Sequence, residues 1–171
     1  MSAEKSRVRE REAEAVPRSP YEVAMKLRQE FILFQLTGKV VVKAEEREWF
    51  TTRQGRLKFY LNPGMYRDHA LRDWAVFCQD VINHSGRHNH QGGLAVFVTE
   101  GRGYSVINGE RVDWEAGDLL LLPLLPGGCD HQHFNLEPER GCRWMAFSYL
   151  PQREEVANQI TQLAISPLGG A

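Results

Sequence analysis

The chain has 171 residues, of which 42% are apolar and 25% charged, and its formal net charge is −1. This length suffices for one globular domain with a sizeable core, and the small net charge does not indicate a nucleic-acid partner or an anionic membrane surface. The apolar runs are far shorter than the ~18 residues that span a bilayer, so no membrane partner is expected. Three cysteines without a C-x-x-C pair imply no disulfide framework, which favours a cytoplasmic protein.

The N-terminal part divides into a charged arm and a helix. Residues 1–18 mix both charges with almost no large apolar side chain, which predicts a flexible arm, and residues 19–171 are expected to form a single domain. Ser19 suits the N-cap, Pro20 suits the first helical position, and Gly38 is placed to end the helix. Apolar residues recur every three or four positions, which predicts a face that covers the barrel or a partner subunit; they are Val23, Leu27, Phe31 and Phe34.

Residues 39–150 change to a pattern of short strands separated by turn residues. The β-branched run Val40–Val42 opens this region, and Gln54-Gly55 divides two strand-like segments. Asn108-Gly109 is the strongest short hairpin signal in the chain. This spacing predicts an all-β fold, an antiparallel barrel with helices only at its two ends. Its further strands are expected at residues 74–82, 94–98, 104–107, 110–114 and 142–150.

The residue pattern also gives expectations for the C-terminal segment and for strand 142–150. Residues 154–163 are expected to form a short helix and residues 166–171 a loose tail. Alternation along strand 142–150 places one of two sets of side chains toward the barrel lumen, and the sequence does not choose between them. One set is Arg143, Met145, Phe147 and Tyr149, and the other is Cys142, Trp144, Ala146 and Ser148.

Four of the six histidines lie in two clusters about forty residues apart. In extended chain, side chains two positions apart share a face, so His88 and His90 lie together, as do His131, His133 and Asn135. Two such strands meeting face to face would bring three or four imidazoles to one point. Converging neutral imidazoles suit Fe, Zn, Cu, Ni or Mn, so the clusters predict a metal site.

The two clusters and the meander between them resemble the signature motifs of the cupin superfamily, small β-barrels that hold a metal inside. His88-Asn89-His90 matches the first motif, and Gly117, Pro126-Gly127-Gly128, His131 and Asn135 match the second. The glutamate of the first motif is absent, since Leu94 and Ala95 stand near its place. The resemblance covers about residues 73–150 and implies a jelly-roll barrel with its metal-binding core there.

Without that glutamate, three neutral imidazoles leave the full charge of a divalent cation at the site, which favours an anionic, chelating ligand. A three-histidine site of this kind resembles the gentisate 1,2-dioxygenase group of Fe(II) ring-cleaving enzymes, although those enzymes have two barrels. The resemblance implies a non-haem Fe(II) dioxygenase in which a small aromatic or enolisable anion and O2 meet at a metal held by His88, His90 and His131. His133 and Asn135 then support the ligands or act in catalysis, with His133 as the candidate fourth ligand. The candidate substrate-binding residues are Gln91, Arg143, Tyr104 and Trp144.

Other functions fit the same pattern. One is a non-catalytic or sensory cupin that binds a small molecule, and another is a metal-dependent isomerase or lyase on the same site. Nothing in the residues selects Fe(II) over Mn, Ni, Cu or Zn. A homodimer is expected as the assembly.

Overall fold

The computed structural model describes residues 19–156 and 159–169. The predicted charged arm, residues 1–18, lies outside this range. The described part forms the helices α1 (Pro20–Thr37), η1 (Ala44–Glu46) and α2 (Leu150–Glu155), and the strands β1 (Trp49–Thr52), β2 (Gly55–Leu61), β3 (Trp74–Asp80), β4 (Arg87–His90), β5 (Leu94–Glu100), β6 (Arg102–Ile107), β7 (Glu110–Glu115), β8 (Leu119–Leu122), β9 (Cys129–Asn135), β10 (Arg143–Tyr149) and β11 (Thr161–Ala164).

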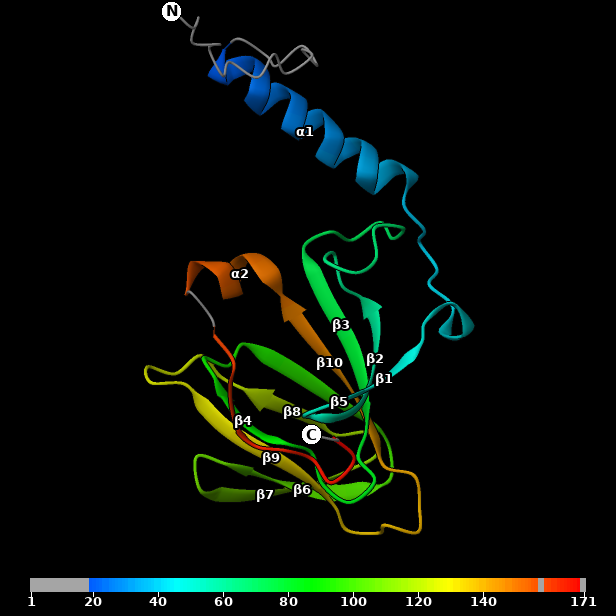
Figure 1. The fold of residues 1–171 in the computed structure, drawn as a ribbon, viewed down its shortest axis with the longest axis vertical. Helices are drawn as coiled ribbons and strands as arrows, with labels where there is room; N and C mark the ends of the chain where they lie inside the picture. Colours follow the sequence, from blue (N-terminus) through cyan, green and yellow to red (C-terminus); the bar gives the residue numbers. More distant parts are fainter. Residues whose placement is uncertain (1–18, 157–158, 170–171) are drawn as a thin grey trace, which may run out of the picture.

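The strands form two antiparallel sheets (Figure 1). One has the order β1-β2-β3-β10-β5-β8 and the other the order β11-β4-β9-β6-β7. Side chains alternate in and out along β9 and β10, and the inward ones pack between the sheets. The core contains Val81, Val96, Trp114, Leu122 and Trp144. The all-β jelly-roll prediction is therefore confirmed.

The Asn108-Gly109 hairpin joins β6 to β7 as predicted. Asn108 has φ 50° and Gly109 has φ 87°, so both central residues are left-handed, as a type I′ turn requires. The twist of this turn matches the twist of the strands that it connects.

Helix α1 begins as predicted but does not cover the barrel. The N–H of Glu22 donates to Ser19 Oγ at 3.2 Å, and Pro20 occupies the first turn. None of its residues is buried, and the helix stands away from both sheets (Figure 1). Of the two expected alternatives, packing of its apolar face on the barrel is therefore wrong, and packing on a partner subunit stays a prediction. In the run Val40–Val42 after it, Val40 and Val41 are exposed and none of the three residues belongs to a sheet, so the strand expected there is absent from the described structure.

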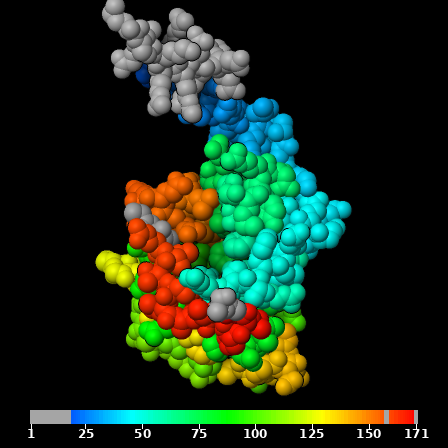
Figure 2. Space-filling model, in the orientation of Figure 1, coloured from blue at the N-terminus to red at the C-terminus, as the bar shows by residue number. Residues whose placement is uncertain are grey.

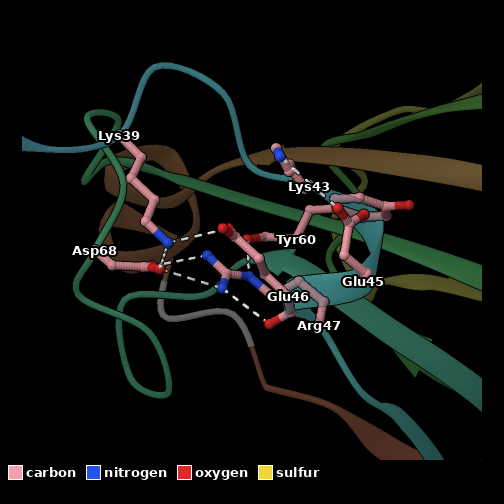
Figure 3. Close-up of polar contacts among 7 residues, drawn as sticks. All are labelled: Lys39, Lys43, Glu45, Glu46, Arg47, Tyr60 and Asp68. Carbon is pink, nitrogen blue, oxygen red and sulfur yellow. Dashed lines mark hydrogen bonds and ion pairs between the residues drawn. The ribbon is translucent and has the colours of Figure 1, made fainter.

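The segment between α1 and β1 is fastened to the loop after β2 by charged side chains (Figure 3). The guanidinium of Arg47 donates to both carboxylate oxygens of Asp68, at 2.7 and 3.2 Å, and to the carbonyl of Tyr60 at 3.0 Å. Lys39 lies between Asp68, at 3.2 Å, and Glu46, at 3.0 Å. The side chain of Arg47 is only 3% exposed, and a charge this deep needs such a partner. The hydrogen bond from Arg47 lowers the pKa of Asp68.

The C-terminal segment differs from the prediction. Helix α2 begins directly after β10, with Pro151 in its first turn, and ends at Glu155. Part of the predicted helix 154–163 is instead strand β11, which pairs with β4 at the edge of the five-stranded sheet. Pairing with a sheet edge outweighs a weak helical pattern here. Ser166 is buried and donates to the carbonyl of His84 at 3.1 Å, so the tail is attached at this point rather than loose.

Candidate metal centre

The two histidine clusters meet because β4 and β9 are neighbours in one sheet. The antiparallel register pairs His88 with His131 and His90 with Cys129. Alternation then turns His88, His90 and His131 to the same inward face, where all three are buried. Their ligand nitrogens lie within 4.8 Å of one another. The clusters thus converge side by side, whereas the expected arrangement was two strands facing each other.

Hydrogen bonds at Nδ1 set the ring protons of these histidines. Nδ1 of His131 lies 2.9 Å from the carbonyl of Cys129, and Nδ1 of His88 lies 3.4 Å from the carbonyl of Gly86. A carbonyl accepts only, so each Nδ1 carries the proton and each Nε2 keeps a free lone pair, the usual arrangement for a metal-binding histidine.

His90 differs from the other two. Its Nδ1 accepts from the backbone N–H of Gly92 at 2.9 Å, so the proton of the neutral ring lies on Nε2. A metal held by Nε2 would require this proton to move to Nδ1, which would then no longer accept from Gly92, and a metal held by Nδ1 would likewise replace the contact with Gly92.

Burial keeps the cluster neutral. Desolvation, together with a smaller contribution from a neighbouring imidazole, lowers the pKa values of His88, His90 and His131 to about 4 each. The positive charge of Arg153 also lowers the pKa of His90. At neutral pH the three rings are therefore unprotonated, the form that binds metals.

His133 lies on the same face, and its ring is held by two further side chains. Ser105 Oγ lies 2.7 Å from His133 Nδ1 and accepts the indole N–H of Trp114 at 2.9 Å. The hydroxyl proton of Ser105 has no other acceptor among the described residues, so it is donated to Nδ1 of His133. This leaves the ring proton of His133 on Nε2, where it acts as a donor and not as a lone pair. Burial lowers the pKa of His133 well below its usual range.

These histidines line a cavity of about 640 Å³. Its mouth lies between the segment after β10 and the loops at either end of β2, and Figure 2 shows a hollow between these orange and cyan-to-green parts. Most of the wall is apolar, as is typical of sites that bind small molecules. The apolar wall includes Leu57, Phe59, Phe77, Leu94, Val96, Leu122, Trp144, Leu150 and Ile160.

Residues 82–148, which contain all four of these histidines, match the profile of the cupin domain family. The protein carries a cupin domain. No curated protein matches the chain. The described residues contain no helix long and apolar enough to cross a membrane.

Two solved structures with TM-scores of 0.51 support the cupin fold. A variant of the Streptomyces protein PAC13 with uridine is 17% identical, with a TM-score of 0.51, and the match covers 74% of this chain and 92% of that one. A cupin-like protein from Thermotoga maritima is 16% identical, with a TM-score of 0.51 over 68% of this chain and 87% of that one. A salicylate 1,2-dioxygenase variant from Pseudoaminobacter salicylatoxidans with gentisate is 18% identical, with a TM-score of 0.49 over 84% of this chain and 36% of that one. At these identities the likeness concerns the fold alone.

Of the four candidate substrate-binding residues, only Trp144 lines the cupin cavity. It is buried, and its ring centroid lies 4.9 Å from that of His133. The inward set of β10 is therefore the one with Trp144, Ala146 and Ser148, which settles the open choice of face. Arg143 belongs to the opposite set and pairs with Asp80.

Gln91 and Tyr104 also lie outside the cavity wall. The side-chain oxygen of Gln91 accepts the backbone N–H of Gln159 at 3.0 Å, in the turn after β4. Tyr104 stacks on Phe134 with ring centroids 4.6 Å apart, and the guanidinium of Arg111 covers its ring at 3.9 Å from the centroid. Both side chains are thus engaged by protein neighbours away from the histidines.

Asn135 has a structural position in this cupin. Its Nδ2 donates to the carbonyls of Val81, Ile82 and Arg140 at 3.1–3.2 Å, and its Oδ1 accepts the N–H of Glu137 at 2.8 Å. The amide therefore ties the loop after β9 to the end of β3 and does not line the cavity.

Sequence reasoning missed the contribution of the C-terminal segment to the wall. Arg153, Glu154, Ile160 and Gln162 line the cavity because α2 and β11 fold back across its mouth. The pairing of β11 with the histidine strand β4 creates this wall, and no local motif indicates a pairing between residues more than seventy positions apart.

Proposed function

We propose that this cupin is a metal-dependent dioxygenase, with Fe(II) as the metal, that acts with O2 on a small aromatic or enolisable anion. The observation that carries the proposal is the group of three buried, neutral imidazoles with ligand nitrogens within 4.8 Å, on the wall of a mostly apolar cavity. A cavity of this size accommodates a small substrate with a single ring.

The donor set fits the metal. Imidazole nitrogen is a borderline ligand that suits Fe, and three protein ligands leave positions for other molecules. A bound Fe(II) would supply the open coordination positions at which substrate oxygens and O2 are brought together. Mn, Ni, Cu and Zn suit the same three donors, so metal content is part of the test.

The chain itself supplies a fixed proton donor. Ser105 and Trp114 hold the ring of His133 with its proton on Nε2, beside the ligand histidines. This proton can be donated to an oxygen of a bound substrate, and the mostly apolar wall strengthens that interaction by lowering the local dielectric constant. His133 also lies outside the group of three histidines whose ligand nitrogens lie within 4.8 Å of one another. We therefore assign His133 to catalysis and not to metal ligation.

The assignment is tested by metal content. His88→Ala, His90→Ala and His131→Ala should each lose most of the bound metal, because two imidazoles are too few to hold it. His133→Ala should keep the metal and lose activity about 10–100-fold, as is typical of groups beside the ligands. Metal loss in His133→Ala as severe as in His131→Ala, measured by elemental analysis, would instead support a four-histidine site.

The activity is tested by oxygen consumption. Protein loaded anaerobically with Fe(II) is offered dihydroxybenzoates, aminophenols and β-diketones, with His131→Ala as the control. Uptake above the control is expected with at least one class. Stable metal binding with no uptake for any of them would refute the dioxygenase and favour a metal-dependent isomerase or lyase, or a sensory protein.

We also propose that two copies associate. The outward face of β5 and β8 exposes Phe97, Leu119 and Leu121 side by side, and α1 buries none of its residues in a single copy. An isolated helix is marginal in water, so a second copy would stabilise α1 by covering its apolar side. Light scattering should give a dimer mass, and Leu119→Lys with Leu121→Lys should shift it toward the monomer. A monomeric wild-type protein at micromolar concentration would refute the dimer.

A further inference from the structure

Arg153 is a charged group of the cavity wall that has no partner among the described residues. Its side chain is partly buried where α2 closes the cavity, and it makes no hydrogen bond or ion pair with any residue that the structure describes. The other arginines that are similarly withdrawn from water are paired, Arg47 with Asp68 and Arg143 with Asp80. Glu154 follows Arg153 directly on the helix, and consecutive helical side chains do not face each other.

The surroundings make this unpaired charge costly. Burial lowers the pKa of Arg153, and its charge reaches the imidazole cluster, since it lowers the pKa of His90. A guanidinium stays charged under all ordinary conditions, so an anion relieves this cost more completely than a neutral acceptor does. Because Arg153 lies in the cavity wall, a molecule bound in the cavity can supply this anion.

We propose that Arg153 binds a carboxylate of the substrate while other oxygens of the same molecule face the three histidines. A guanidinium fork matches a carboxylate through two parallel hydrogen bonds, which fixes both position and orientation. The inference rests on the proposed function and narrows its substrate class from small anions in general to carboxylates. Arg153 is then a specificity-determining residue.

Arg53 is the competing candidate, because it lines the same cavity. Its side chain is exposed, whereas Arg153 is partly buried, so solvent weakens its attraction for an anion more strongly. Arg53 therefore serves as the matched control, with the same substitution in the same cavity.

The test compares 3,4-dihydroxybenzoate with catechol. Both present two neighbouring hydroxyls, and only the first carries a carboxylate. Each is titrated calorimetrically under argon into Fe(II)-loaded full-length protein. The wild type should bind the carboxylate about 10–100-fold more tightly than catechol, as expected for hydrogen bonds to a charged group. Arg153→Met should remove this preference without changing catechol affinity by more than about 3-fold, and Arg153→Lys should keep part of it.

Thermal unfolding provides a second measurement. Arg153→Met should leave the metal-loaded, ligand-free protein equally or more stable, because an unpaired charge is removed from a partly buried site. A strong loss of stability would show that Arg153 has a structural partner and would overturn the inference. Arg53→Met should keep the preference for the carboxylate.

Three results separate this inference from the proposed function. If the wild type does not prefer the carboxylate, or if Arg53→Met removes the preference instead, the inference falls whatever the oxygen assay shows. If Arg153→Met still prefers the carboxylate and the wild type consumes oxygen, the inference about Arg153 is refuted and the dioxygenase proposal is supported. If the wild type prefers the carboxylate, Arg153→Met removes that preference and no oxygen is consumed, the role of Arg153 is supported and the dioxygenase proposal is refuted.

Discussion

Replacement of Ser105 by alanine tests the hydrogen-bond chain behind His133. Ser105 is 0% exposed, and its Oγ is the partner of both His133 Nδ1 and the indole N–H of Trp114. The substitution leaves two buried polar groups without that partner, at a cost of about 1–3 kcal/mol each. We expect the free energy of unfolding to fall by about 2–6 kcal/mol, which corresponds to about 6–18 °C in Tm for a chain of this length.

Ser148→Ala is the matched control. Ser148 is also 0% exposed, but its Oγ has no hydrogen-bond partner in the described structure. Its removal should be neutral or slightly stabilising, since a buried unpaired hydroxyl is costly. Urea denaturation of both variants, compared with the wild type, measures the difference.

The ring proton of His133 gives an independent readout. In ¹⁵N-labelled protein, the proton should lie on Nε2 in the wild type, and Ser105→Ala should weaken that preference. A wild-type proton on Nδ1, or equal stability for Ser105→Ala and Ser148→Ala, would refute the hydrogen-bond chain.

Two further predictions concern stability. The pKa values of about 4 for His88, His90 and His131 lie below the unfolded value of 6.5, so the unfolded chain binds more protons between these limits. The metal-free protein should therefore lose stability as the pH falls from 6.5 to 4, by about 3 kcal/mol for one such group; urea titrations at several pH values that show no loss would contradict this. Asp68→Asn should cost about 1–3 kcal/mol because Arg47 loses its charged partner, whereas Asp113→Asn, on an exposed pair with Arg111, should cost under about 1 kcal/mol by the same method.

Local sequence determined the parts of this protein that depend on neighbouring residues. Ser19 and Pro20 begin α1 through contacts within one turn, and Asn108-Gly109 adopts the left-handed conformations that close a hairpin. Alternation along β4 and β9 places His88 with His90 and His131 with His133. These features require only backbone geometry that operates over a few residues.

The tertiary structure decided how the histidine-bearing faces of β4 and β9 come together. The register that sets His88 opposite His131 arises from the pairing of two distant strands, and Arg143 and Asp80 pair across β10 and β3 on the other face. The sequence indicates that Arg143 and Trp144 alternate, yet only the packing of both sheets shows which of them is inside.

The C-terminal segment shows the same distinction most clearly. Residues 161–164 carry too little local preference to define a strand, and they become one because the edge of β4 offers unpaired backbone groups. That pairing brings the segment around α2 across the cavity and places Arg153 near the histidines. Short sequence motifs thus identify the candidate metal-binding histidines. The charge and shape of the cavity around them arise from long-range contacts that only the folded chain contains.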